Sequence, residues 1–425
     1  MKKTLLTICL VWMCFSLSAQ KIIDLSGKWS FSIDRQDNGE KEKWFSHTLN
    51  DFINLPGSMP EKQKGDEVTA KTQWTGSLYD SSYYYNPYME KYRKEGNIKF
   101  PFFLTPDKHY VGAAWYQKEV NIPADWKGER ILLFLERPHI ETTVWVNGQK
   151  TGMQNSLCVP HQYDITHYVR PGKCTITIRV DNRIKEINVG PDSHSITDQT
   201  QGNWNGIVGR ICLQTTPKTY FDDIQIYPEP EQKLARVKVV IKGTGTAKVK
   251  LSAESFNTDK KHIVPAIQQE IKLNKGVTET EMVLPMGNDM LLWDEFHPAL
   301  YKLKAEVTNG KKTEIKEIQF GMRRFEIKGK WFYVNGRKTQ LRGTVENCDF
   351  PLTGYAPMDV ESWERVFRIC RSYGLNHMRF HSFCPPEAAF IAADRVGFYL
   401  QPEGPSWPNH GPKLGLGQPI DKYLM

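Results

Sequence analysis

The sequence predicts a multidomain protein with an all-β sandwich, then an immunoglobulin-like β-sandwich, then an α/β region. Three observations lead to this fold class. The first part has runs of β-branched and aromatic residues, the middle part alternates polar and apolar residues, and in the last part strand-like and helix-like segments take turns. At 425 residues the chain exceeds what one hydrophobic core usually holds, so we expect two to four domains.

Residues 20–217 make up the first predicted domain. The runs Ile131–Glu136, Thr142–Asn147 and Thr175–Val180 are rich in β-branched and aromatic side chains. The dipeptide Asn147-Gly148 favours a type I′ turn, which joins two antiparallel strands. We therefore expect a β-sandwich here.

Residues 218–322 show the clearest period of two. In Lys248–Ala253 and in Tyr301–Val307, polar and apolar side chains alternate, which places one face of each strand in a core and the other in water. About 100 residues of such strands predict the immunoglobulin-like sandwich.

Residues 323–425 change to an α/β pattern. One helix is predicted to begin after the N-cap Asp359 and to stop at Gly374, and a second to begin after Pro386 and to end at Gly397. Strands are predicted at Thr339–Val345, Asn376–Phe380 and Phe398–Gln401. This order implies parallel strands joined by helical crossovers, in a barrel or an open sheet. A complete barrel takes about 250 residues, so at most three of its eight strands are expected here.

The first residues are typical of a secretory signal peptide. Lys2 and Lys3 precede the apolar run Leu5–Phe15, and small residues follow up to Ala19, after which we expect cleavage. Residues 1–19 are therefore excluded from the folded protein, which we expect to be exported, periplasmic or secreted. No other run approaches the roughly 20 apolar residues of a membrane span, so no membrane partner is expected.

Charge and motif content exclude several other classes. The formal net charge is +8, but the lysines are scattered and form no basic run, so we expect no nucleic-acid partner. The six cysteines after residue 19 lack zinc-site spacing and are interpreted as small packed residues, with one disulfide left open. Phosphate loops and metalloprotease or serine-hydrolase motifs are absent, so no cofactor or metal is expected. The sequence leaves the oligomeric state open.

Short motifs occur in a fixed order along nearly the whole mature chain. They are Leu25–Trp29, Leu55–Ser58, Val111–Tyr116, Val144–Gly148, Trp204–Ile207, Leu292–Trp293, His297–Tyr301, Phe320–Arg323, Phe332–Gly336 and Leu341–Gly343. In this order they resemble glycoside hydrolase family 2. The resemblance implies a jelly-roll sugar-binding domain, an immunoglobulin-like sandwich, and the first three β/α units of a TIM barrel.

Members of that family are retaining exo-glycosidases, such as β-galactosidases, β-glucuronidases and β-mannosidases. Their chemistry needs two carboxylates about 5 to 5.5 Å apart. In the family these are glutamates after barrel strands four and seven, so the resemblance places both beyond Met425 and leaves no catalytic residue in this chain. We expect a fragment that is inactive by itself and whose partner is a glycoside or oligosaccharide substrate. The alternative is a non-catalytic carbohydrate-binding protein or an inactive truncated product.

Candidate substrate-binding residues follow the three predicted barrel strands, because barrels present functional side chains at the carboxyl ends of their strands. The candidates are Asn347, Asp349, Arg379, His381, Glu403 and Trp407. Arg379 and His381 stand in place of the family's arginine and histidine after strand two, although Arg-Phe-His-Ser is shifted by one from the commoner order. An arginine can buttress a carboxylate, and a histidine can hydrogen-bond a hydroxyl. A purely structural role for either stays open.

The other candidates depart further from the family pattern. Asn347-Cys348 replaces a common His-Glu, which puts a galactosidase or glucuronidase assignment in doubt. Asn347 and Asp349 could hydrogen-bond sugar hydroxyls or cap a loop. Glu403 is not interpreted as a catalytic acid, because the family's pair lies elsewhere. Trp407 could stack on a sugar ring or be a lid or core residue.

Overall fold

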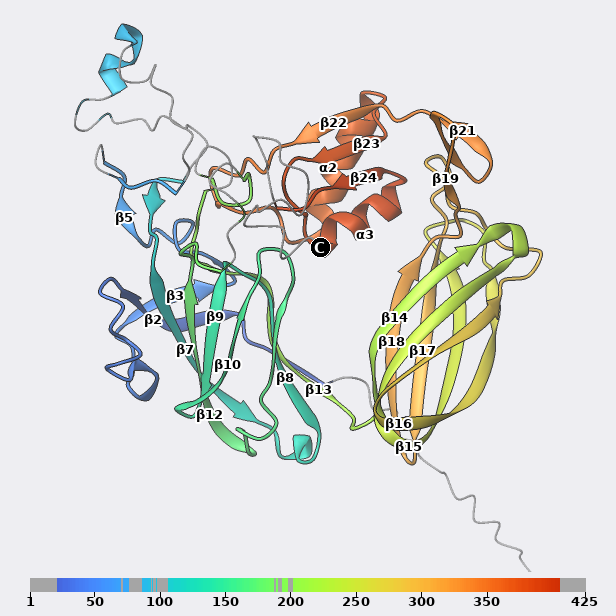
Figure 1. Cartoon of the computed structure of the whole chain (residues 1–425), viewed down its shortest axis with the longest axis horizontal. Coiled ribbons are helices and arrows are strands. Elements are labelled where there is room, and N and C mark those ends of the chain that lie inside the picture. Colours follow the sequence, from blue (N-terminus) through green and yellow to red (C-terminus); the bar gives the residue numbers. More distant parts are fainter. Residues whose placement is uncertain are drawn as a thin grey trace, which may run out of the picture.

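The computed structural model describes residues 21–405 except 70–71, 76–85, 93, 95–96, 98–105, 187–188, 190–192 and 198–201. The protein is mostly β-strand with few helices, arranged as two sandwiches side by side and a small α/β unit above them (Figure 1). The predicted signal peptide and Trp407 lie outside the described residues, as does most of the segment between residues 76 and 105.

Two antiparallel sheets form the first sandwich. One has the order β1-β13-β8-β11, with β4 also on β13, and its strands are β1 (Ile22–Asp24), β4 (Gly57–Ser58), β8 (Arg130–Pro138), β11 (His161–Asp164) and β13 (Gly206–Thr216). The other has the order β10-β9-β12-β7-β2-β3, and its strands are β2 (Gly27–Asp34), β3 (Asp51–Leu55), β7 (Ala113–Ile122), β9 (Glu141–Val146), β10 (Gln149–Asn155) and β12 (Gly172–Asp181). The first strand of the domain thus pairs with its last, Ile22 opposite Gln214. The strands β5 (Asp66–Glu67) and β6 (Lys108–His109) pair with each other as a short antiparallel ribbon.

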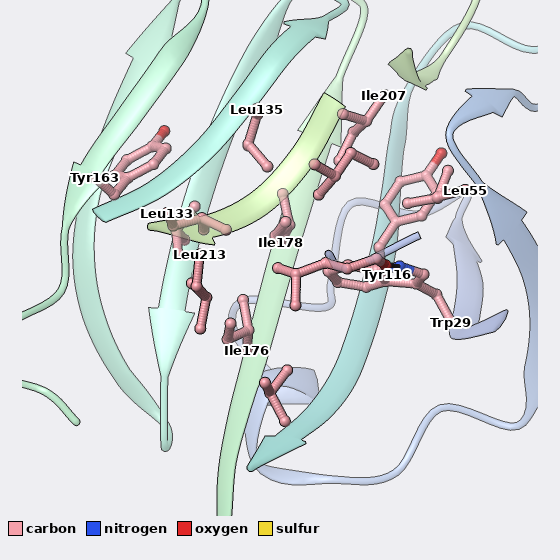
Figure 2. Close-up of a cluster of buried hydrophobic side chains, with 14 of the residues drawn as sticks. Trp29, Leu55, Tyr116, Leu133, Leu135, Tyr163, Ile176, Ile178, Ile207 and Leu213 are labelled. Atoms are coloured by element: carbon pink, nitrogen blue, oxygen red, sulfur yellow. Dashed lines mark hydrogen bonds between the residues drawn. The ribbon is translucent and has the colours of Figure 1, made fainter. Parts of the chain in front are cut away.

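Apolar side chains from both sheets meet in one core (Figure 2). One sheet contributes Leu133, Leu135, Tyr163, Ile207 and Leu213, and the other contributes Trp29, Leu55, Tyr116, Ile176 and Ile178. The strands predicted within β8, β9 and β12 are confirmed. So is the hairpin turn between β9 and β10, where Asn147 and Gly148 have φ values of 50° and 78°.

The second sandwich is built on two unusually long strands. Its elements are β14 (Tyr220–Glu229), β15 (Leu234–Phe256), β16 (Ile263–Pro285), β17 (Leu300–Asn309) and β18 (Lys312–Phe320). The first half of β15 pairs with β14 and the second half with β17, while β16 pairs along both halves. The register shifts between Gly243 and Gly245, and apolar residues from both sides of this shift belong to one core. The alternating strands predicted in β15 and β17 are confirmed.

The last region begins with an antiparallel ribbon of β19 (Phe325–Lys328), β20 (Trp331–Val334) and β21 (Arg337–Thr339). It continues as β22 (Gly343–Glu346), α2 (Val360–Ser372), β23 (His377–Phe380), α3 (Glu387–Val396) and β24 (Tyr399–Pro402). The strands β22, β23 and β24 are parallel neighbours, as predicted. Asp359 caps α2 by accepting from the Ser362 amide at 2.7 Å, and Gly397 ends α3 with a φ of 77°.

The predicted strand Thr339–Val345 was wrong as one element. It is divided into β21, which is antiparallel to β20, and β22, which is parallel to β23. The chain must change sheets between them. At the break, the Arg342 amide donates to the Asn376 side chain at 2.7 Å and not to a ladder partner.

Ile178→Ala tests the core of the first sandwich. The side chain is fully buried, so its truncation should lower the free energy of unfolding by about 2–5 kcal/mol through lost apolar burial and a residual cavity. The measurement is urea unfolding followed by tryptophan fluorescence. The matched control is Ile22→Ala in the same sandwich, where the side chain is 60% exposed and the loss should stay within about 0.5 kcal/mol. Equal losses in the two variants would contradict the assigned core.

Candidate functional site

The carboxyl ends of the three parallel strands lie in one row. Glu346, the last residue of β22, is opposite Phe380 at the end of β23, which is opposite Pro402 at the end of β24. Residues that follow these strands are therefore brought to the same edge of the sheet. This edge carries five of the six residues predicted from the sequence, and Trp407 lies outside the described residues.

An ion pair joins the ends of β23 and β24. The Arg379 Nε donates to Glu403 Oε1 at 2.5 Å, and the Ser382 amide donates to Glu403 Oε2 at 2.9 Å. Partial burial disfavours ionisation of Glu403, but these two donors outweigh it and hold its pKa below the ordinary value of 4.5. Arg379 thus contacts a carboxylate, and Glu403 is an ionised, fully engaged group rather than a proton donor.

His381 is held from two domains. Its backbone amide donates to the carbonyl of Glu346 at 2.9 Å, which ties the end of β23 to that of β22. Its ring packs edge-on against the ring of His194, with 4.2 Å between the centroids. His194 belongs to the first sandwich domain and is 5% exposed. Burial and the neighbouring His381 lower the pKa of His194 to about 4, so this ring is neutral at pH 7.

The segment around His194 also holds the loop after β23. Ser195 Oγ donates to the Ser382 carbonyl at 2.8 Å, and Ser193 Oγ donates to the carbonyl of Pro405. Two serines and one histidine of the first domain therefore line the strand ends of the α/β unit.

The loop after β22 places two carboxyl groups near each other. The pKa of Glu346 is raised above its ordinary value of 4.5, and burial is the main cause. Hydrogen bonds from the backbone amides of Cys348 and Asp349 lower it in part, and the negative charge of Asp349 raises it further. The pKa of Asp349 is also raised by burial. Within the described residues, Asp349 Oδ1 is buried without a hydrogen-bond partner, while the Asp349 side chain as a whole is half-buried. Asn347 is exposed beside them.

The same loop is docked on the first sandwich. Ser58 Oγ donates to the Thr353 carbonyl at 2.5 Å, and the Tyr355 hydroxyl donates to Glu61 at 2.9 Å. Between these loops, Arg137 at the end of β8 donates to the carbonyl of Cys158 at 3.3 Å and to that of Cys384 at 3.2 Å. The strand ends and the sandwich thus form one composite edge.

Sequence reasoning missed two parts of this site. The strand-end rule gave no reason to select Glu346, since its neighbours and burial depend on the folded loop. No pattern could have indicated His194, because its partner His381 is far away in the sequence and belongs to another domain.

The cysteines are small packed residues in part: Cys174, Cys212 and Cys348 are buried, the other three are half-buried, and all six are free thiols.

No group of three or more histidine, cysteine, aspartate or glutamate side chains is arranged to hold a metal ion in the part of the chain that the structure describes. Over the same residues, none of the helices has the length and apolar character needed to cross a membrane.

Known sequences agree with this architecture. Residues 22–217 match "Glycosyl hydrolases family 2, sugar binding domain", and residues 219–323 match "Glycosyl hydrolases family 2". The two matches together cover most of the chain. The protein belongs to glycoside hydrolase family 2.

Several individual proteins are similar. Human β-glucuronidase is 24% identical over 417 residues, which are 90% of this chain and 57% of the relative. A putative β-glucuronidase of Formosa agariphila is 27% identical over 309 residues, which are 71% of this chain and 36% of the relative. A β-galactosidase of Thermoanaerobacter pseudethanolicus is 24% identical over 334 residues, which are 74% of this chain and 42% of the relative.

Among solved structures, the β-glucuronidase of Ruminococcus gnavus superposes with a TM-score of 0.67 at 20% identity, covering 91% of this chain and 59% of that chain. At this identity the likeness shows the fold alone. The chain spans about half the length of the relatives that it matches.

The two glutamates at the strand ends should respond oppositely to neutralisation. Glu403 has a lowered pKa, so its charge stabilises the fold above pH 4.5 and the contribution disappears as the pH falls through the lower folded-state value. Glu403→Gln should therefore lower the free energy of unfolding at pH 7 by about 1 kcal/mol, and less at pH 3.

Glu346→Gln is the matched control. A raised folded-state pKa means that ionised Glu346 opposes folding at pH 7, and this penalty vanishes below pH 4.5. The variant should be as stable as wild type at pH 7 or slightly more stable. Urea unfolding between pH 7 and pH 3 measures the free energy of unfolding of both variants. A Glu346→Gln loss larger than that of Glu403→Gln would contradict the assigned electrostatics.

Proposed function

We propose that this protein is a retaining, exo-acting glycoside hydrolase and that Asn347, Asp349 and His381 hold its sugar substrate. The observation that carries the proposal is the set of polar groups gathered at the carboxyl ends of β22, β23 and β24, in a chain that belongs to glycoside hydrolase family 2. The strand-end position is where α/β barrels carry their chemistry.

The proposed roles follow from the contacts. Asp349 accepts from a sugar hydroxyl through its carboxylate, because the residue is only half-buried and a carboxylate offers acceptors alone. His381 donates or accepts at a second hydroxyl, and the neutral His194 ring fixes the plane of His381. Arg379 positions Glu403 and, through it, the Ser382 turn. Asn347 is exposed and can approach the sugar from the solvent side.

Bond cleavage requires two further carboxylates. A retaining reaction needs a proton donor and a nucleophile about 5 to 5.5 Å apart. We propose that both are glutamates in the part of the enzyme corresponding to the unmatched length of its relatives. The parallel order β22-α2-β23-α3-β24 supports a further proposal, that these elements are the first three units of a (β/α)8 barrel following a jelly-roll domain at 20–217 and an immunoglobulin-like domain at 218–322.

We also propose that the protein is exported. The basic and apolar character of residues 1–19 supports a cleaved signal peptide. An exported glycosidase would meet glycoconjugate or polysaccharide fragments.

The chain from residue 20 to residue 425 should not hydrolyse nitrophenyl glycosides. It lacks the proposed acid and nucleophile, which together supply most of the rate enhancement. The assay compares β-galactoside, β-glucuronide and β-mannoside substrates against buffer. Measurable turnover that copurifies with the chain would show that its own carboxylates are sufficient.

In an active enzyme that includes this chain, His381→Ala should lower kcat/KM by roughly 10- to 100-fold, the effect of one lost hydrogen bond to the reacting sugar. The matched control is His297→Ala, since the His297 side chain is 81% exposed in the second sandwich and should not affect kinetics. Thermal unfolding of both variants checks the fold. An unchanged kcat/KM for His381→Ala would assign His381 a structural role.

A further inference from the structure

A groove on the first sandwich extends to its junction with the second sandwich and is remote from the strand-end site. Two cavities of about 610 and 390 Å³ share the lining residues Lys127, Gly128 and Lys218. They lie where β8 begins, at Arg130, and just beyond the end of β13, at Lys218. The strand-end site lies at the other ends of these two strands (Figure 1). Since β8 has nine residues, the separation is roughly 30 Å.

The groove has an apolar floor. Ile122, Trp126, Ile131 and Val169 line the larger cavity and are all buried side chains of the first sandwich. Such a floor can accept the apolar face of a flat ring, and the volume is within the range of small-molecule sites.

The rim of the groove is positively charged. Its two carboxylates are already engaged: Asp164 pairs with Arg130 at 2.7 Å and Glu129 pairs with Lys312 at 2.5 Å. The remaining charged side chains are Lys127, Arg170 and Lys218, all exposed.

Across the described ranges, none of these three cations makes an ion pair with a carboxylate. The Arg170 guanidinium is held by the Val169 and His167 carbonyls at 2.7 and 3.4 Å, which fixes its position at the rim. An excess of three unpaired cations over an apolar floor is complementary to a ligand that has both a ring and an anionic group.

We propose that this groove is a second binding site, for an acidic saccharide that carries carboxylate or sulfate groups. The preference for an anion follows from the groove alone. The choice of a saccharide rests on the proposed glycosidase function, because an enzyme that acts on a polysaccharide gains affinity when a remote site holds another part of the same chain. The ring lies on the floor, and the acidic group lies between Lys127, Arg170 and Lys218.

Calorimetric titration of the purified chain tests this site without any hydrolysis, so its result is independent of the proposed activity. The probes are a sulfated oligosaccharide, an oligogalacturonate, a neutral cello-oligosaccharide of equal length, and tripolyphosphate. The two acidic saccharides distinguish sulfate from carboxylate as the recognised group. We expect binding of at least one acidic saccharide, weakening as salt is added, and no measurable binding of the neutral one.

The triple variant Lys127→Ala/Arg170→Ala/Lys218→Ala should weaken that binding at least about tenfold. Its matched control removes two lysines and one arginine elsewhere, Lys248→Ala/Lys272→Ala/Arg365→Ala, all exposed, and should leave affinity within about twofold. Because Arg170 also supports its loop, the double variant Lys127→Ala/Lys218→Ala keeps the test decisive if the triple variant misfolds. Absent binding of both acidic saccharides, equal affinity in variant and control, or tripolyphosphate binding as tight as the saccharide would each overturn the proposal.

Discussion

A single guanidinium bridges the α/β unit and the first sandwich, alongside the hydrogen bonds of Ser58, Tyr355 and Ser195. Arg137 stands at the end of β8 and donates to the carbonyls of Cys158, Cys384 and Pro385, which belong to a sandwich loop and to the loop after β23. An arginine suits this place because its planar fork holds several donors in fixed directions. Without this anchor, the loops on either side would leave half-buried carbonyls unpaired, at an energetic cost per group.

This docking makes the strand-end site a product of two domains. The loop after β23 is fixed from one side by Arg379 and Glu403 and from the other by Ser195. The opposite pKa shifts of Glu346 and Glu403 follow from the same arrangement, because one carboxylate receives only backbone donors in a buried loop and the other faces a guanidinium. A sugar held here would meet both environments along one sheet edge.

Much of this fold could be predicted from local pattern, and the site only in part. The alternating residues of β15, the Asp359 cap and the β-α-β-α-β order were all readable because they depend on neighbours in sequence. The break between β21 and β22 could not be predicted in this way. At the break the Arg342 amide bonds to Asn376, which lies more than thirty residues further along the chain. Parallel strands explained why Arg379, His381 and Glu403 would converge. The contribution of His194 depends on domain docking, which no local period encodes.

The pairing of β1 with β13 also governs when the first sandwich can be completed. Ile22 finds its partner Gln214 only after nearly the whole domain has been made, so the sheet remains open at that edge throughout synthesis. Closing such a long loop is slow, because its entropy is lost before the contacts form. The chain must therefore pass through states with an unpaired strand edge, and a chaperone that covers this edge would act most usefully before Thr216 emerges.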